Sequence, residues 1–376
     1  MTTPVPHPPV RALWLIKGLG RGGAEHLVLR SLPLVDRRRV EVEVAYLLPW
    51  KDALVPDIEA TGTTVHCLGA TRSLDPRWTI RLRALVRERG IDIVHTHLPY
   101  AGVGARLTVP RRLPLVHTEH NTWARYRPTT RLANRATIGR NSTVIAVSEA
   151  VAASIRVPIW ARRHPEVRVI IHGIDTGGAR QGPDARDHAR ALLGLPSDAL
   201  VVGTVGNLTD KKAHDTLLAA FAATRARVPE AHLVIVGDGP LHEKLETLAS
   251  SLGVADHVTF AGSRGDVFEL LPGFDVFALS SRHEGLPIAL IEALASALPC
   301  VCTTVGGVPE VVVDGREGLL VPPEDPEAFS SALTALLLDP DQRAEMASRA
   351  AARGAVFGLR PSVAAVQAMY ETLVRR

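Results

Sequence analysis

Two glutamates eight residues apart, Glu284 and Glu292, are the residues whose type and spacing point most directly to chemistry. Gly285 and Pro287 lie between them, and Pro287 is well suited to begin a helix. We therefore expect Glu284 in a loop and Glu292 in the second turn of that helix. The N–H groups of a first helical turn attract anions, and carboxylates beside an anion suit a ligand rich in hydroxyl groups. The pattern favours a sugar phosphate, although a capping carboxylate next to a solvated one explains it too.

A glycine-rich segment near the N-terminus, residues 17–25, follows an apolar run and precedes a helical pattern. Its glycines match Gly-x-Gly-x-x-Gly, a spacing that lets the backbone approach a phosphate. A nicotinamide-dependent dehydrogenase also needs an acidic residue at the end of its second strand, to hold the ribose. Here that strand, residues 40–48, ends in Ala-Tyr-Leu-Leu, and its glutamates, Glu41 and Glu43, lie at its start. The segment therefore predicts an anion-binding loop and disfavours a dinucleotide site.

The elements that must position these residues alternate between apolar runs and helical patterns, which predicts an α/β protein with doubly wound parallel sheets. Several runs lack a two-residue alternation, as strands buried on both faces do. At 376 residues the chain exceeds one ordinary core, and glycines and Pro183 within residues 175–187 predict a linker between two domains. The expected strands are residues 12–16, 40–47, 64–67, 91–96, 115–118, 144–147, 200–205, 232–236, 258–261, 276–279 and 300–303.

Positive charge is concentrated in the first half of the chain. Residues 1–180 hold 27 Lys and Arg against 14 Asp and Glu, a net charge of +13, while the remainder holds 16 against 25, a net charge of −9. Such a half attracts an anionic membrane or a phosphorylated substrate, although solvated helix faces explain it equally well. We expect no nucleic-acid partner. The apolar residues 12–16 are too few for a signal peptide or a spanning helix, so a cytoplasmic protein is expected.

The cysteines and the aspartate pairs point to neither disulfides nor a metal site. Cys67, Cys300 and Cys302 show no metal-ligand spacing, and the last two lie in an apolar run typical of buried strands. The Asp-x-Asp pair formed by Asp339 and Asp341 lies between two helical patterns, where helix capping is the expected role. The sequence therefore predicts no metal cofactor.

The segment His-Glu-Gly-Leu-Pro-Ile-Ala-Leu-Ile-Glu that ends at Glu292 resembles the E-x7-E signature of family 4 retaining glycosyltransferases. The resemblance extends over about residues 13–329. It implies a GT-B fold, in which two Rossmann-like domains face each other across a cleft. Other motifs similar to those of the family occur in its order at residues 22–25, 92–97, 146–149, 171–175, 237–240 and 306–310.

The resemblance also implies how the chain is divided and which residues bind the donor. It implies an acceptor-side domain at residues 10–178, with a C-terminal helix at 360–376 packing back on it, and a nucleotide-sugar domain at 188–355. Glu292 is expected to bind the ribose and Glu284 the transferred sugar. The backbone is expected to contact the donor diphosphate at Gly22, Gly23, Leu290 and Ile291.

One motif departs from the family pattern. The family uses an Arg and a Lys on Gly-Arg-Leu-x-x-x-Lys-Gly, and residues 206–213 read Gly-Asn-Leu-Thr-Asp-Lys-Lys-Ala. Lys212 therefore takes the place of the lysine, and Asn207 replaces the arginine. An amide can donate a hydrogen bond to phosphate, but it cannot neutralise charge on the leaving diphosphate. We expect Lys212 to carry that role, and Lys211 can compensate in part.

Histidines at strand ends complete the candidate site. The resemblance places His120 where family members carry an active-site histidine, so we expect it to contact the donor. His95 and His97 alternate on a neighbouring strand, and His97 is the one expected to face the cleft. Glu119 and His120 are both candidates for a catalytic base, as is the leaving phosphate itself.

Together these features predict a retaining glycosyltransferase that moves a sugar from a nucleotide-diphosphate donor to an acceptor hydroxyl without a metal. UDP is the donor nucleotide we expect first, although the sequence does not specify the base. The acceptor is not specified either, and a lipid-linked acceptor at an anionic membrane surface is one hypothesis. The alternatives are a nucleotide-sugar epimerase of the same fold and a non-catalytic relative that binds sugar nucleotides or lipids.

Overall fold

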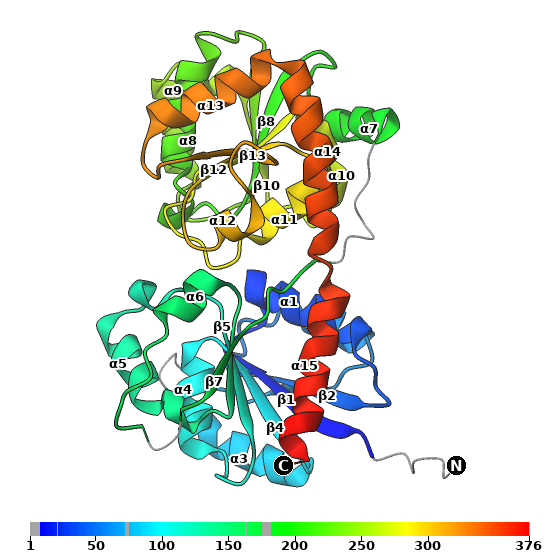
Figure 1. Cartoon of the computed structure of the whole chain (residues 1–376), viewed down its shortest axis with the longest axis vertical. Helices are drawn as coiled ribbons and strands as arrows, with labels where there is room; N and C mark the ends of the chain where they lie inside the picture. Colours follow the sequence, from blue (N-terminus) through cyan, green and yellow to red (C-terminus); the bar gives the residue numbers. More distant parts are fainter. Residues whose placement is uncertain (1–7, 21, 72–74, 162–163, 175–181, 376) are drawn as a thin grey trace. The chain divides into compact units, whose positions relative to one another are not determined.

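The computed structural model describes residues 8–20, 22–71, 75–161, 164–174 and 182–375 (Figure 1). The chain divides into two compact units, one made of Met1–His172 with Leu359–Arg376 and the other of Gly173–Gly358. Of the predicted linker, residues 175–181 lie outside the described residues. The rest differs from the prediction, because Pro183 occupies the first turn of helix α7 (Pro183–Leu193), a position that suits its fixed φ and missing N–H.

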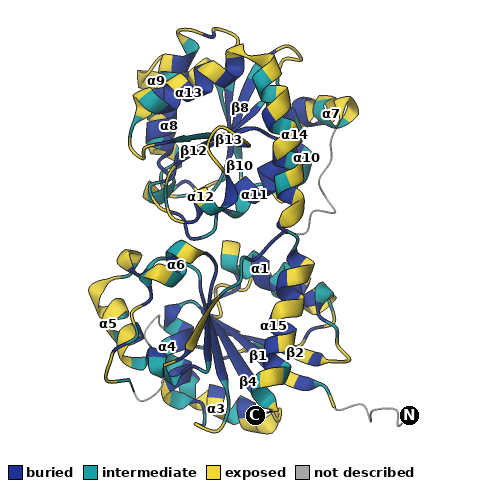
Figure 2. Ribbon diagram, in the orientation of Figure 1, coloured by how far each residue is buried: buried dark blue, intermediate teal, exposed yellow. Residues whose placement is uncertain are grey.

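The first unit is built on a seven-stranded parallel sheet with strand order β3-β2-β1-β4-β5-β6-β7. Its strands lie between helices and are mostly buried (Figure 2), which explains why their sequences are continuous apolar runs. The strands are β1 Val10–Ile16, β2 Val40–Tyr46, β3 Val65–Cys67, β4 Ile93–His97, β5 Leu115–Glu119, β6 Thr143–Ala146 and β7 Glu166–Val169.

The C-terminal helix α15 (Leu359–Val374) belongs to this first unit and packs on β1 and α1. Its Tyr370 is fully buried and hydrogen-bonds Nδ1 of His95, and its Gln367 exchanges hydrogen bonds with the backbone of Asp36. The other helices are α1 Gly23–Ser31, α2 Val55–Ala60, α3 Trp78–Glu88, α4 Pro99–Thr108, α5 Pro128–Thr137, α6 Glu149–Ser154 and the short 3-10 helices Leu32–Leu34, Trp123–Arg125 and Ile138–Arg140.

The second unit has a six-stranded parallel sheet with strand order β10-β9-β8-β11-β12-β13. Both sheets therefore confirm the expected α/β class. The strands are β8 Leu200–Val205, β9 Ala231–Val236, β10 Val258–Gly262, β11 Val276–Leu279, β12 Cys300–Thr303 and β13 Gly318–Val321.

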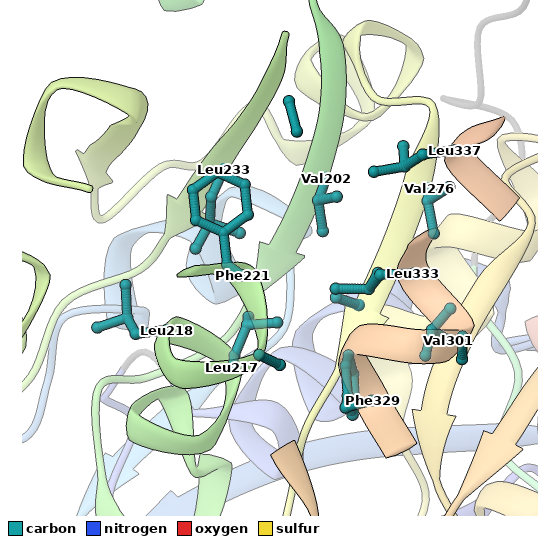
Figure 3. Packing of buried hydrophobic residues seen from close by; sticks show 14 of the residues in the cluster. Val202, Leu217, Leu218, Phe221, Leu233, Val276, Val301, Phe329, Leu333 and Leu337 are labelled. Atoms are coloured by element: carbon teal, nitrogen blue, oxygen red, sulfur yellow. The ribbon is translucent and has the colours of Figure 1, made fainter. Parts of the chain in front are cut away.

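A hydrophobic core joins helices α8 (His214–Arg225) and α13 (Pro326–Leu338) to one face of the second sheet, and Figure 3 shows Phe221 and Phe329 within it. The helix-capping role expected for Asp339 is confirmed, since its carboxylate accepts a hydrogen bond from the backbone N–H of Gln342 at 2.9 Å. The remaining helices are α8 His214–Arg225, α9 His242–Ser251, α10 Val267–Leu270, α11 Ile288–Ala295, α12 Val308–Val311, α13 Pro326–Leu338, α14 Pro340–Val356 and the 3-10 helices Asp210–Lys212, Ala255–His257 and Leu271–Gly273.

All of the expected strands are present, and two strands were missed, β7 and β13. Strand β7 is an edge strand whose residues are largely exposed, so it lacks an apolar run. Strand β13 begins with Gly318, where a Cβ would lie 2.2 Å from the carbonyl oxygen of Cys300. Because β12 approaches so closely, β13 needs a glycine at this position, and glycine weakens the pattern by which a strand is predicted from the sequence.

In each sheet the strand order reverses at one point, between β1 and β4 in the first unit and between β8 and β11 in the second. Loops that leave the carboxyl ends of two such strands turn to opposite sides, and ligands of open α/β sheets bind in the crevice they leave. Most of the predicted site residues follow these strands, whereas Glu119 and His120 lie at the end of the neighbouring strand β5.

Candidate functional site

In the second unit, the side chains of Lys212 and Glu284 are in direct contact. Nζ of Lys212 lies 2.6 Å from Oε1 of Glu284, and the hydroxyl of Ser281 donates to the same oxygen at 2.6 Å. The side chains of the pair are 13% and 5% exposed, so water screens their charges little. Two residues 72 positions apart in the sequence therefore form a buried ion pair at the strand ends.

The Lys212–Glu284 pair also sets the charge of the glutamate. Burial raises the pKa of Glu284, but the ammonium groups of Lys212 and Lys211 and the hydrogen bonds from Lys212 and Ser281 outweigh this effect. The pKa of Glu284 therefore lies below its ordinary value, and the carboxylate is ionised at neutral pH. An ionised carboxylate accepts hydrogen bonds from sugar hydroxyls and is no proton donor.

Two contacts hold Lys212 in place, one at its backbone carbonyl and one along its side chain. Lys212 ends the 3-10 helix Asp210–Lys212, and its carbonyl oxygen accepts a hydrogen bond from the hydroxyl of Ser280 at 2.9 Å. A Cβ on Gly206 would lie 3.1 Å from Cε of Lys212, so the lysine stem packs directly on that glycine. The glycine that follows β8 thus provides the room in which Lys212 reaches Glu284.

Arg282 is a site residue that the sequence analysis did not identify. Its guanidinium donates to the carboxylate of Asp215 at 3.0 Å, to that of Glu324 at 2.9 Å and to the backbone carbonyl of Asp210 at 2.6 Å. The backbone N–H of Arg282 donates to the backbone carbonyl of Lys211 at 2.8 Å. Arg282 therefore joins the loop of Lys212 to the loop of Glu284. The only feature of the sequence that pointed to Arg282 was its position two residues before Glu284.

The Gly306 loop packs against the backbone of Glu284. A Cβ on Gly306 would lie 1.8 Å from the carbonyl oxygen of Glu284, and its φ of 52° is in the left-handed region. Only glycine fits a position where backbone meets backbone in this way. The motif at residues 306–310 thus packs directly on the backbone of Glu284.

Helix α11 carries three of the expected donor-binding residues. Glu292 is 6% exposed and lies in its second turn, as expected, whereas Leu290 and Ile291 are fully buried. The N–H groups of Leu290 and Ile291 both donate to the carbonyl of Pro287, at 3.1 and 3.2 Å. They are therefore engaged within the start of the helix. The unengaged donors of the first turn, among the described residues, are the N–H groups of Ile288 and Ala289.

Asn207, which stands where the family has an arginine, is not hydrogen-bonded to the ion pair in the described chain. It is exposed, and in the part of the chain that the structure describes its side-chain amide makes no hydrogen bond. Its carbonyl accepts from the N–H of Thr209 at 2.9 Å, which shapes the turn after β8. The amide is therefore available to a ligand, and Lys212 does not depend on it for position.

In the first unit, Gly22 and Gly23 form the start of helix α1 at the carboxyl end of β1. Gly22 is the cap residue, and a Cβ there would lie 2.3 Å from a carboxylate oxygen of Glu25. A Cβ on Gly23 would meet nothing within 4 Å. A side chain at the first glycine would displace the carboxylate of Glu25, while the second leaves open space above the backbone.

His120 follows β5 and contacts His97 at the end of β4. Nε2 of His120 lies 3.2 Å from Nδ1 of His97, whose ring stacks on that of His95 with centroids 4.5 Å apart. Burial, and after it the neighbouring histidines, hold the pKa values of His120 and His97 well below their usual range. Both rings are therefore neutral, and the expected alternation of His95 and His97 on one face is confirmed.

Glu119, one of the three candidate bases, has a structural role. It is fully buried, and its carboxylate accepts hydrogen bonds from Nε1 of Trp123 at 2.9 Å, the hydroxyl of Tyr126 and the amide of Asn134 at 3.2 Å. A carboxylate with no exposed surface cannot reach an acceptor hydroxyl. Glu119 instead fastens the segment that follows β5 to the sheet.

Within the described ranges, no group of three or more His, Cys, Asp or Glu side chains is arranged to hold a metal ion. No helix among the described residues is long and apolar enough to cross a membrane.

Comparisons with known proteins extend over both units. Residues 185–353 match the family model described as glycosyl transferases group 1, and residues 21–177 match the model described as glycosyltransferase family 4. A relative from Mycolicibacterium smegmatis, named GDP-mannose-dependent alpha-(1-6)-phosphatidylinositol monomannoside mannosyltransferase, is 34% identical over 80% of this chain and 82% of its own. D-inositol 3-phosphate glycosyltransferase from Saccharomonospora viridis is 31% identical over 77% of this chain and 72% of its own.

Solved structures show the same fold. Anabaena HepE, in complex with UDP and glucose, has a TM-score of 0.86 at 22% identity, covering 96% of this chain and 100% of that one. Sucrose-phosphate synthase from Thermosynechococcus elongatus has a TM-score of 0.83 at 22% identity, covering 96% of this chain and 99% of that one.

Proposed function

Because the chain belongs to glycosyltransferase family 4 and has the GT-B fold, we propose that this glycosyltransferase retains the configuration of the sugar and needs no metal. Its donor is a nucleotide-diphosphate sugar, and its acceptor provides a hydroxyl group. The observation that supports this proposal best is the buried contact of Lys212 with Glu284, beside the first turn of α11.

The chemistry of the leaving group explains the need for these residues. Breaking the anomeric bond leaves new negative charge on the diphosphate. The ammonium of Lys212 and the free N–H groups at Ile288 and Ala289 can stabilise that charge, as a divalent cation does in other transferases. One charge-assisted hydrogen bond contributes roughly 1.5–3 kcal/mol.

The glutamates orient the donor in this proposal. Ionised Glu284 accepts hydrogen bonds from hydroxyls of the transferred sugar, and Glu292 accepts those of the ribose. The acceptor hydroxyl attacks from the face that the phosphate leaves, so configuration is retained, and the leaving phosphate takes the proton. This route needs no protein base, in agreement with the buried position of Glu119.

We further propose a UDP-sugar as the first candidate donor and GDP-mannose as the second. HepE was solved with UDP, and the mycolicibacterial relative is named for GDP-mannose. For the acceptor we propose a lipid-linked hydroxyl compound at an anionic membrane surface, which makes the protein a peripheral enzyme of the cytoplasmic face. The basic first 180 residues and the name of the phosphatidylinositol mannoside relative support this choice.

A donor screen tests the proposal. The full-length protein is incubated with UDP-, GDP- and dTDP-sugars and a panel of inositol and lipid acceptors, and released nucleotide is measured with and without EDTA. We expect release that depends on the acceptor and persists in EDTA, and an anomeric proton in the product with the donor's configuration. An inverted product or full loss of release in EDTA contradicts the mechanism. Turnover of the donor without an acceptor indicates an epimerase instead.

A further inference from the structure

His97, which no proposed step uses, makes the contact that decides how His120 is protonated. Its Nδ1 lies 3.2 Å from Nε2 of His120. A neutral imidazole carries a single N–H, so one ring must donate and the other must accept. The direction of this one hydrogen bond therefore assigns the tautomer of both rings.

The surroundings of the other ring nitrogen of His97, Nε2, indicate the direction of the hydrogen bond between His97 and His120. Its Nε2 is buried and, within the described residues, has no hydrogen-bond partner. If His120 donated, His97 would carry its proton on Nε2, and that buried N–H would lack an acceptor. An orphaned buried N–H is rarer in proteins than a buried acceptor without a donor. The pairing in which His97 donates is therefore the favoured one.

A small cavity lies next to His97. It has a volume of about 20 Å³, is lined by His97, His172 and Trp14, and is otherwise bounded mainly by apolar side chains of β2, α1 and α15. Among the described residues, no side chain of this lining is hydrogen-bonded to Nε2 of His97, and Nε2 of His172 is buried and unpartnered too. An N–H at Nε2 of His97 would therefore point to no acceptor within the described residues.

We propose that His97 is a positioning residue that donates from Nδ1 to Nε2 of His120 and so holds His120 as its Nδ1–H tautomer. His120 then presents an N–H from Nδ1. It acts on the donor sugar or phosphate as a hydrogen-bond donor and does not serve as the base for the acceptor. This inference rests on the proposed function for the identity of the substrate, but the tautomer itself does not depend on it.

The tautomer can be measured directly in the full-length protein. With ¹⁵N-labelled histidine, long-range ¹H–¹⁵N correlation spectra distinguish protonated from bare ring nitrogens, and the His120→Asn variant assigns the His120 signals. We expect a protonated Nδ1 and a bare Nε2 for His120. A protonated Nε2 in the wild-type protein overturns the proposal.

Variants of His97 test whether it acts on His120 through its hydrogen bond or only by filling space beside it. The amide nitrogen of Asn takes the place of Nδ1 of His, so His97→Asn can still donate, while His97→Leu fills the same space without a donor. We expect the Nδ1–H signature of His120 to survive in His97→Asn and to be lost in His97→Leu, with kcat reduced about tenfold more in the latter. Equal signatures in both variants overturn the proposal.

Substitution of His120 itself distinguishes a donor from a base. His120→Asn keeps an N–H near the position of Nδ1, whereas His120→Gln places its amide near Nε2. We expect His120→Asn to retain about ten times more activity than His120→Gln. Equal and complete loss in both is the result expected for a base and contradicts the proposal. If the wild-type protein transfers no sugar to any acceptor, the proposed function fails, while the NMR result still decides the tautomer.

Discussion

Lys212 donates from Nζ to Oε1 of Glu284 across 2.6 Å, so each buried charge is balanced by the other before any donor binds. A nucleotide-sugar brings its own negative charge on the diphosphate and its own hydroxyls. The ammonium can then serve the diphosphate while the sugar hydroxyls satisfy the carboxylate. The ion pair therefore keeps Glu284 ionised and holds both side chains in place for the donor.

Lys212→Met is expected to lower kcat by about 100- to 1,000-fold, because it removes the positive charge that faces the leaving group. It also leaves the Glu284 carboxylate buried without its partner, which we expect to lower the free energy of unfolding by about 2 kcal/mol. Urea unfolding and initial rates of nucleotide release measure the two effects.

The double variant Lys212→Met with Glu284→Gln is the control for that experiment. Removing both charges leaves no unpaired ion, so we expect most of the lost stability to return while activity stays low. Recovery of activity together with stability contradicts a role for Lys212 in the chemistry.

Acid should weaken the folded protein partly through Glu284. Its pKa in the folded state lies below the ordinary value because of Lys212 and Lys211, despite the opposing effect of burial. The pair therefore contributes its full stabilisation above the unfolded-state pKa of about 4.3 and loses it as the pH falls through and below that value. Between pH 6 and pH 3.5, we expect the melting temperature of wild type to fall further than that of Glu284→Gln. Parallel curves count against the pair.

Arg282→Ala is expected to lower kcat about tenfold without changing the chemistry, since Arg282 joins the loops that carry Lys212 and Glu284. Arg282→Lys keeps the charge but cannot donate to Asp215, Glu324 and the backbone at once, so an intermediate rate is expected. Steady-state rates of the two variants, with melting temperatures for folding, test this. A rate for Arg282→Ala equal to wild type shows that the loops hold their positions without it.

Most of the fold could be predicted from the sequence because strands buried on both faces of a parallel sheet consist of consecutive apolar residues. The runs that became β8, β11 and β12 were predicted with the same bounds as those in the structure. Strand β7 lacked that signal because an exposed edge strand needs no apolar face. Pro183 was assigned to the linker although it begins helix α7, because proline marks loops as well as first helical turns.

The site was predictable only as far as its motifs extend. That Lys212 belongs to the same site as Glu284 followed from resemblance alone, because no spacing rule relates residues so far apart in the chain. The three acceptors of Arg282 and the contact of His97 with His120 depend on how loops from different strands meet. Such contacts are set by tertiary packing, which leaves no local pattern in the sequence.

Gly306→Ala should destabilise the second unit more than an ordinary substitution of a glycine with positive φ. Its Cβ would lie 1.8 Å from the carbonyl oxygen of Glu284, so the loop must move and the glutamate with it. Gly315→Ala is the matched control, because Gly315 has a φ of 74° but a Cβ there would meet nothing within 4 Å. We expect about 1 kcal/mol of lost stability for Gly315→Ala. Gly306→Ala should lose clearly more, together with activity. Similar melting temperatures for the two variants contradict this account of the loop.

The exposed face of α5 is where membrane binding can be tested. Arg131 and Arg135 are exposed on it, and Leu132 between them is 70% exposed, a combination of charge and apolar surface that suits an anionic bilayer. Each arginine near such a surface contributes about 1 kcal/mol, so Arg131→Gln with Arg135→Gln should weaken binding to phosphatidylserine-containing liposomes by roughly 30-fold at low salt. The pair Arg225→Gln with Arg227→Gln removes the same charge from the second unit and should bind like wild type. Co-sedimentation that is equal in both double variants, or unchanged by added salt, argues against an electrostatic membrane contact through α5, because screening must weaken any such attraction.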